Sequence, residues 1–213
     1  MKYIALLRGI NISGKNKISM SELKSELENN KYQNVTTYLN SGNVIFESSI
    51  DNKETIMKDI NKIINDKFNL EIPVFIMTTS ELENTLNHSP NWWGTENKEI
   101  YDNLIFIIPP TKYNEVYNTI GEPSKDIEKI EEYNNYIFWS FDLNKYRKAN
   151  WWIKTASTDI KDKITIRTAN TMRKVLELSR PLPGLSRIAR SSCFLASVQG
   201  GNPRGPMRAF LVK

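Results

Sequence analysis

The sequence contains only one cysteine, Cys193, and one histidine, His88, among its 213 residues. A single cysteine excludes a disulfide within the chain, and a single histidine excludes a zinc site of the Cys/His kind built from one chain. A Ser-His-Asp triad would require His88, which lies in a segment rich in serine, proline and asparagine that is typical of a solvated loop. We therefore expect no metal and no cofactor.

Long apolar runs are also missing, since no stretch of about 18 apolar residues occurs. The chain passes from Met1-Lys2 directly into a strand-like segment, without the apolar region of a signal peptide. These two observations predict a cytoplasmic protein without membrane association. A hydrophobic fraction of 39% with 25% charged residues is ordinary for a globular protein.

The excess of positive charge is confined to the C-terminus. From Arg180 onward the chain has five arginines, one lysine and no acidic residue. That segment's charge of +6 exceeds the net +5 of the whole chain and leaves −1 for residues 1–179. Residues 1–179 therefore lack the basicity of a dedicated nucleic-acid-binding protein, and we expect any such binding to occur through the tail.

The tail, residues 180–213, differs from the rest of the chain in composition. The preceding residues use 19 lysines and four arginines, whereas the tail prefers arginine and holds four of the nine glycines and four of the nine prolines. Three interpretations stay open: a disordered basic arm, a nucleic-acid-binding extension, or a non-native sequence such as a frameshift or vector read-through. The change of preferred basic residue favours the last.

Residues 1–78 predict one β-α-β-β-α-β unit. The segment 3–7 is apolar at both alternations, which is typical of a central strand covered on both faces. Helical spacing and β-branched or aromatic runs then predict helices at 19–28 and 56–68 and strands at 35–39, 44–47 and 72–77. This element order is that of a ferredoxin-like unit.

Residues 79–179 predict the same order again, without alignable sequence. A further helix begins at 79, and a polar loop at 89–99 is the expected junction. Strands at 103–108, 127–131, 136–141 and 164–167 then alternate with helices at 113–120, 149–160 and 171–178. We therefore predict an α+β protein of two tandem ferredoxin-like plaits with mainly antiparallel sheets. Its domains would be 1–78, 79–179 with extra helices, and the tail 180–213.

The loop between the first strand and the first helix is the main candidate site. It contains two cations, two glycines that free the backbone and two neutral polar side chains: Arg8, Lys15, Gly9, Gly14, Asn11 and Ser13. Backbone amides at a helix N-terminus attract anions, so the pattern predicts a pocket for a small phosphate or carboxylate ligand. The loop lacks the Walker form G-x-x-x-x-G-K-[ST], and a purely structural turn is the alternative.

Two other classes of function compete with anion binding. An acyl-phosphate or phosphate-ester hydrolase would use Arg8 to hold phosphate and Asn11 or Asn34 to orient water. A nucleic-acid or protein interaction module would use exposed aromatic side chains together with the tail arginines. The residue pattern assigns no catalytic set.

Two loop motifs carry a family resemblance. Arg8-Gly9-Ile10-Asn11 after the first strand and Leu39-Asn40-Ser41-Gly42-Asn43-Val44 later in the chain closely resemble a widespread bacterial family, domain of unknown function 1697. The resemblance covers roughly residues 1–179. It implies a fold of paired ferredoxin-like units and implies no activity.

A second anion site is suggested where a late strand meets the last helix. The family usually has Arg-Asn-Trp-Asn-Thr there, and this chain keeps Arg167, Asn170 and Thr171 but has Thr168 and Ala169 in between. A guanidinium beside a helix N-terminus predicts an anion site, with a plain helix cap plus a surface arginine as the alternative. Any role that needs the family's indole is in doubt here.

The segment Asn40–Asn43 reads as a tight hairpin turn. We expect the two central strands of this β-α-β-β-α-β unit to run parallel, which places the turn at the end of the sheet opposite Arg8. The two loop motifs would then share a site only if the second domain or another subunit folds between them.

Overall fold

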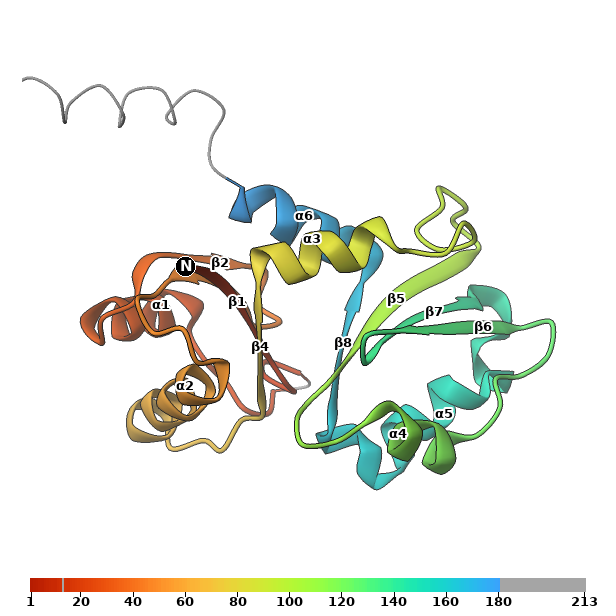
Figure 1. The fold of residues 1–213 in the computed structure, drawn as a ribbon. Coiled ribbons are helices and arrows are strands. Elements are labelled where there is room, and N and C mark those ends of the chain that lie inside the picture. Colours follow the sequence, from red (N-terminus) through yellow and green to blue (C-terminus); the bar gives the residue numbers. More distant parts are fainter. Residues whose placement is uncertain (13, 181–213) are drawn as a thin grey trace, which may run out of the picture. The chain divides into compact units, whose positions relative to one another are not determined.

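The computed structural model describes residues 1–12 and 14–180, which form two four-stranded antiparallel sheets with helices (Figure 1). The mixed α/β class expected from the sequence is confirmed. Ser13 and the tail beyond Arg180 lie outside the described residues, and the predictions made for them stay predictions. Within the described ranges, no helix has the length and apolar character needed to span a bilayer.

The first sheet has the strand order β2-β3-β1-β4. Its two helices begin at side-chain caps, because Ser19 accepts a hydrogen bond from the amide of Glu22 and Asn52 accepts one from the amide of Thr55. The elements are β1 (Lys2–Leu7), α1 (Met20–Asn29), β2 (Gln33–Tyr38), β3 (Asn43–Glu47), α2 (Lys53–Phe68) and β4 (Val74–Thr78).

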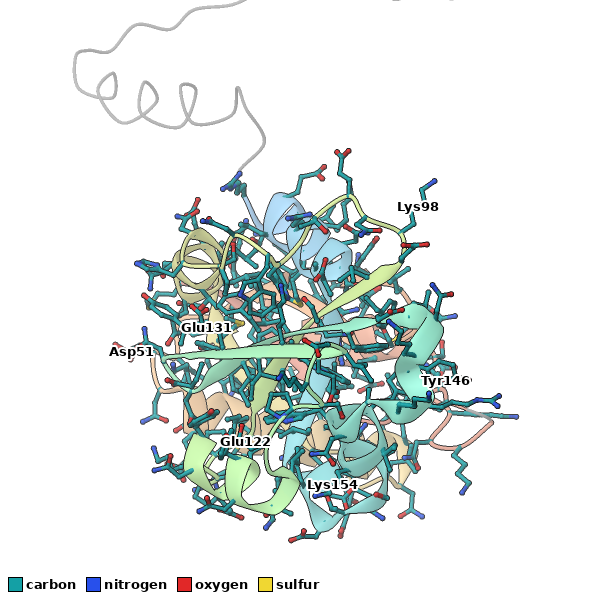
Figure 2. All side chains as sticks on the ribbon, turned by 90° about the vertical axis from the view of Figure 1, so that its right-hand side faces the viewer. Asp51, Lys98, Glu122, Glu131, Tyr146 and Lys154 are labelled. Carbon is teal, nitrogen blue, oxygen red and sulfur yellow. The ribbon has the colours of Figure 1, made fainter. Side chains whose placement is uncertain are left out.

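The second sheet has the corresponding order β6-β7-β5-β8. Lys154 donates a hydrogen bond of 2.7 Å to the carbonyl of Ile120 and so connects the helix 150–157 to the end of the helix 113–120. Glu122 and Lys154 mark this side of the sheet in Figure 2. The strands are β5 (Ile100–Ile107), β6 (Glu128–Tyr133), β7 (Tyr136–Asp142) and β8 (Ile164–Thr168). The helices are α3 (Thr79–Asn87), α4 (Tyr113–Ile120), η1 (Leu143–Lys148), α5 (Asn150–Ser157), η2 (Asp159–Asp162) and α6 (Ala169–Ser179).

The two central strands are covered on both faces, as their uninterrupted apolar sequences predict. In β1, Tyr3, Ala5 and Leu7 enter the core under α1 and α2, whereas Ile4 and Leu6 enter a second core between the sheets. The side chains of β5 divide in the same way. Leu104 and Phe106 lie in that shared core, whereas Ile105 and Ile107 lie in the core under α4 and α5. Helices α3 and α6 pack on each other beside the shared core (Figure 1).

The predicted helix 149–160 is shorter in the structure. Helix α5 ends at Ser157, and the next residue, Thr158, takes an extended backbone with φ at −104° and ψ at 171°. A short 3₁₀ turn, η2, then leads into β8. The apolar spacing that suggested one continuous helix therefore runs across a backbone break at Thr158.

Candidate functional site

The end of β1 lies beside the turn that joins β2 to β3. Strands β1 and β3 pair antiparallel, with Leu6 opposite Asn43, and the amide of Leu7 donates to the carbonyl of Gly42 at 2.8 Å. The prediction that this turn lies opposite Arg8 is therefore wrong, because it assumed parallel central strands. Both loop motifs therefore lie at the same end of the first sheet, and no residue of another subunit is needed to bring them together.

Gly42 is required by this close approach. Its φ of +79° lies in the left-handed region, and a Cβ added there would come within 2.6 Å of the Cβ of Leu7. Gly14 has a similar φ of +77°, but a Cβ added there meets no atom within 4 Å. The two glycines therefore serve different needs: Gly42 lets two chain segments touch, whereas Gly14 only turns the loop.

Asn11 binds the two loops together. Its side-chain amide donates to the carbonyls of Ile18 and Asn40, each at 2.9 Å, and its carbonyl oxygen accepts from the amide of Ile18 at 2.9 Å. The backbone is left-handed here, with φ at 55°, a conformation that asparagine tolerates. Asn11 is thus engaged within the protein at both ends of its amide.

Arg8 points away from this loop and toward η2. Its Nε donates to the carbonyl of Lys161 at 2.5 Å, so it connects the first half of the chain to the second. Burial lowers the pKa of Arg8, while the nearby carboxylate of Asp162 acts in the opposite direction. Arg8 stays charged at neutral pH but does not line the hollow described next.

A solvent-open hollow of about 520 Å³ lies between the loop and the first turn of α1. Asn11, Gly14 and Asn40 form one side. The other side consists of the residues that enter and begin the helix: Lys17, Ile18, Ser19, Met20 and Ser21. Lys15 is exposed on the same loop, and its backbone amide donates a hydrogen bond to the carbonyl of Ile12. We call this feature the α1 hollow.

The sequence pattern missed Lys17, Ser19 and Ser21 as members of a site. The signal was present, because a lysine stands two residues before a helix-capping serine, and such a cation lies next to the positive end of the helix dipole. The hydroxyls of Ser19 and Ser21 lie 2.9 Å apart, and Ser19 also accepts from the amide of Glu22. Of the predicted residues, Asn11 and Gly14 reach the hollow and Arg8 does not.

Arg167 is a buried cross-link between the two halves of the chain. A guanidinium has five N–H groups, and here they bond to acceptors from three segments. These are Asn43 Oδ1 at 2.6 Å, the carbonyls of Leu7 and Ser41 at 2.8 and 2.9 Å, and Thr165 Oγ1 and the carbonyl of Ile166, both at 2.8 Å. Every donor of Arg167 is therefore used within the protein.

The acceptors around Arg167 are all neutral. Within the described ranges, no carboxylate lies within 4 Å of its guanidinium. Burial, together with the charge of Arg8, lowers the pKa of Arg167 to about 10, which still leaves it protonated at neutral pH. The cation is thus held by oriented carbonyl dipoles rather than by an ion pair.

The predicted second anion site has no guanidinium donor to offer. Thr168 caps α6 by accepting from the amide of Thr171 at 3.2 Å, and Asn170 is exposed. The helix cap of the alternative is present, but Arg167 is not the surface arginine expected with it, because it is buried and faces the first sheet. We do not carry this second site into the proposal below. Elsewhere in the described ranges, no cluster of three His, Cys, Asp or Glu side chains is placed to hold a metal.

The fold and the α1 hollow define a mixed α/β protein of two antiparallel sheets, with a cationic loop beside a helix N-terminus. The chain belongs to the family described as "Protein of unknown function (DUF1697)", whose model matches residues 1–138. This confirms the membership suggested by the two loop motifs. Arg167 lies beyond the matched residues.

One similar solved structure is the conserved bacterial protein SP0830 from Streptococcus pneumoniae, with a TM-score of 0.74 and 27% identity over 84% of this chain and 98% of that chain. The first two RRM domains of the yeast poly(U)-binding protein Pub1 give a TM-score of 0.21 and 11% identity over 79% of this chain and 99% of that chain, which supports no conclusion. No curated protein is significantly similar to this sequence.

Proposed function

We propose that this protein binds a small anionic ligand, a phosphate or a carboxylate, in the α1 hollow. The single observation that carries the proposal is the convergence of Lys17 and the first turn of α1 on one open hollow beside the glycine-containing loop. The first amides of a helix have no acceptor within the helix. Here those amides belong to Met20 and Ser21, which line the hollow.

Electrostatics supports the same choice of ligand. The hollow's lining includes one lysine and no acidic residue, and Lys15 lies exposed on the adjoining loop. The partial positive charge at the N-terminus of α1 adds to these cations. Ser21 supplies a hydroxyl that can donate to an oxyanion, which a bare cation site would lack.

Hydrolysis by the same loop is less well supported than binding. The hydrolase alternative needs a free asparagine amide to orient water beside Arg8. Asn11 uses its amide within the protein, and Asn34 donates its amide to Glu47 at 3.0 Å. We therefore propose binding without assigning a reaction.

Calorimetric titration and thermal unfolding with sulfate, inorganic phosphate and acetate test the proposal. We expect a saturable increase in Tm that shrinks as sodium chloride is added, because the site is exposed and its charges are screened. Lys17→Gln should weaken binding about 5–10-fold, which corresponds to about 1 kcal/mol, the upper end for an exposed pair of opposite charges. Arg8→Gln should change the affinity by less than about threefold, because Arg8 bonds Lys161 instead.

Lys62→Gln is the matched control, since Lys62 is exposed and lines a different hollow under α2. It removes the same charge and should leave the affinity unchanged. If Arg8→Gln abolishes binding while Lys17→Gln does not, the anion site lies at Arg8 and the α1 hollow is the wrong location. Equal effects of Lys17→Gln and Lys62→Gln would indicate nonspecific charge attraction and would contradict the proposal.

We also infer that each half is a ferredoxin-like unit, with residues 1–78 and 79–179 as the two repeats. The support is the shared β-α-β-β-α-β order and the matching strand orders, β2-β3-β1-β4 and β6-β7-β5-β8. A single cysteine in the whole chain is consistent with a proposed cytoplasmic location, where disulfides are rare.

A further inference from the structure

A further hollow is lined by residues from both halves of the described chain and was not foreseen from the sequence. Its volume is about 770 Å³, within the range of sites for small organic molecules. Residues at the start of α2 and in β4 form one side, and the end of β5 with the β6–β7 turn forms the other. We call it the interdomain groove.

The wall of the groove is aromatic and apolar. Phe75 and Tyr136 lie edge to face, with ring centroids 6.1 Å apart and planes at 80°, and both rings contact the buried ring of Phe106. Met57 and Ile107 extend the apolar surface. Because Phe75, Ile107 and Tyr136 belong to strands of the two sheets, the wall is formed before any ligand arrives, and little ordering is needed on binding.

Polar groups without protein partners are set into this wall. Among the described residues, the Tyr136 hydroxyl and the Asn134 side-chain amide have no hydrogen-bond partner, and Asn52 uses only its carbonyl oxygen, toward Thr55. Burial, together with the charge of Glu81, raises the pKa of Tyr136, so its hydroxyl keeps its proton and acts as a donor. A ligand here meets an aromatic surface bordered by free hydrogen-bonding groups.

The charges around the groove are paired. Its only lysine, Lys53, bonds Glu81 at 2.5 Å, and Glu81 also accepts from the amide of Thr78. Burial alone would raise the pKa of Glu81, but the hydrogen bonds from Lys53 and Thr78 lower it overall, so the pair stays ionised. Glu54, also in the lining, pairs with Lys58 at 2.6 Å, so the groove carries no net charge, unlike the cationic α1 hollow.

We propose that the interdomain groove binds an uncharged aromatic heterocycle of nucleoside size. The heterocycle lies against Phe75 and Tyr136, accepts a hydrogen bond from the Tyr136 hydroxyl, and pairs its remaining polar groups with Asn134 and Asn52. This site is separate from the α1 hollow and takes an uncharged ligand instead of an anion.

Calorimetric titration of the full chain with adenosine and with guanosine tests this site. We expect one-to-one saturable binding of at least one of them. Met57→Trp, which fills the groove, should lower the affinity at least tenfold. Tyr136→Phe removes only the hydroxyl and keeps the ring, so we expect a loss of about fivefold without a change in the folded state.

Met20→Trp is the matched control, because it places the same bulk in the α1 hollow. It should leave nucleoside binding within twofold and reduce sulfate binding, whereas Met57→Trp should do the reverse. The two sites therefore fail independently. The proposal is overturned if neither nucleoside binds saturably, or if Met57→Trp and Tyr136→Phe both leave the affinity within twofold of the original chain.

Discussion

Replacing Arg167 by methionine is expected to lower the free energy of unfolding by about 3–5 kcal/mol, because several buried acceptors lose their donor at a cost of about 1–3 kcal/mol each. Methionine fills much of the volume but donates no hydrogen bond. It leaves five acceptors from both halves of the chain without their donor, including Asn43, which is fully buried. Urea unfolding followed by circular dichroism measures the change.

Two further variants separate the network from charge alone. Arg167→Lys keeps the charge but has three donors on one nitrogen, so we expect it to recover less than half of the lost stability. Arg147→Met removes an exposed arginine that bonds only the Tyr146 hydroxyl, and we expect a loss below about 0.5 kcal/mol. A loss below about 1 kcal/mol for Arg167→Met would mean that the cross-link contributes little to the fold.

Gly42→Ala is expected to cost about 2–5 kcal/mol of unfolding free energy. A left-handed backbone costs an alanine about 1–2 kcal/mol, and an added methyl group in a packed site costs about 1–3 kcal/mol more. The second cost arises because the new Cβ would stand 2.6 Å from the Cβ of Leu7, at the place where the carbonyl of Gly42 accepts a hydrogen bond from the amide of Leu7 in β1. The same urea titrations measure it.

Gly14→Ala isolates the backbone cost. Its φ of +77° matches the +79° of Gly42, but no atom lies within 4 Å of the added Cβ. We expect a loss of about 1–2 kcal/mol from the left-handed backbone alone. If the two variants lose the same stability, the contact between the turn and β1 accommodates the added methyl group without cost, which contradicts the expected packing penalty.

Most helices and strands could be predicted because their signals are local. The uninterrupted apolar sequences of β1 and β5 correctly indicated burial on both faces, and the serine at position 19 correctly indicated a helix cap. The predicted length of α5 was wrong, because Thr158 takes an extended backbone that ends the helix before the 3₁₀ turn η2. The spacing of apolar residues gives no sign of this break, since Ile160 beyond it is buried like Trp151 in the helix.

The candidate site could be predicted only in part. Sequence spacing located the loop of Asn11 and Gly14 but assigned Arg8 to it, whereas the side chain of Arg8 reaches the carbonyl of Lys161, more than 150 positions away. The interdomain groove left no signal at all, because Met57, Phe75 and Tyr136 each read as ordinary core residues of separate elements. A groove between two halves is defined by their docking, which no single segment encodes.

The sequence by itself determined the family, the order of helices and strands, and the position of the glycine-containing loop, since each depends on residues close together in the chain. The tertiary structure alone decided that β1 and β3 run antiparallel and that both loop motifs therefore lie at one end of the first sheet. It also decided that Arg167 donates to the backbone carbonyls of Leu7 and Ser41 at that end instead of binding a ligand. The physical reason is that hydrogen-bond partners are chosen by proximity in space, and a buried guanidinium takes whichever acceptors the packed sheets bring within reach.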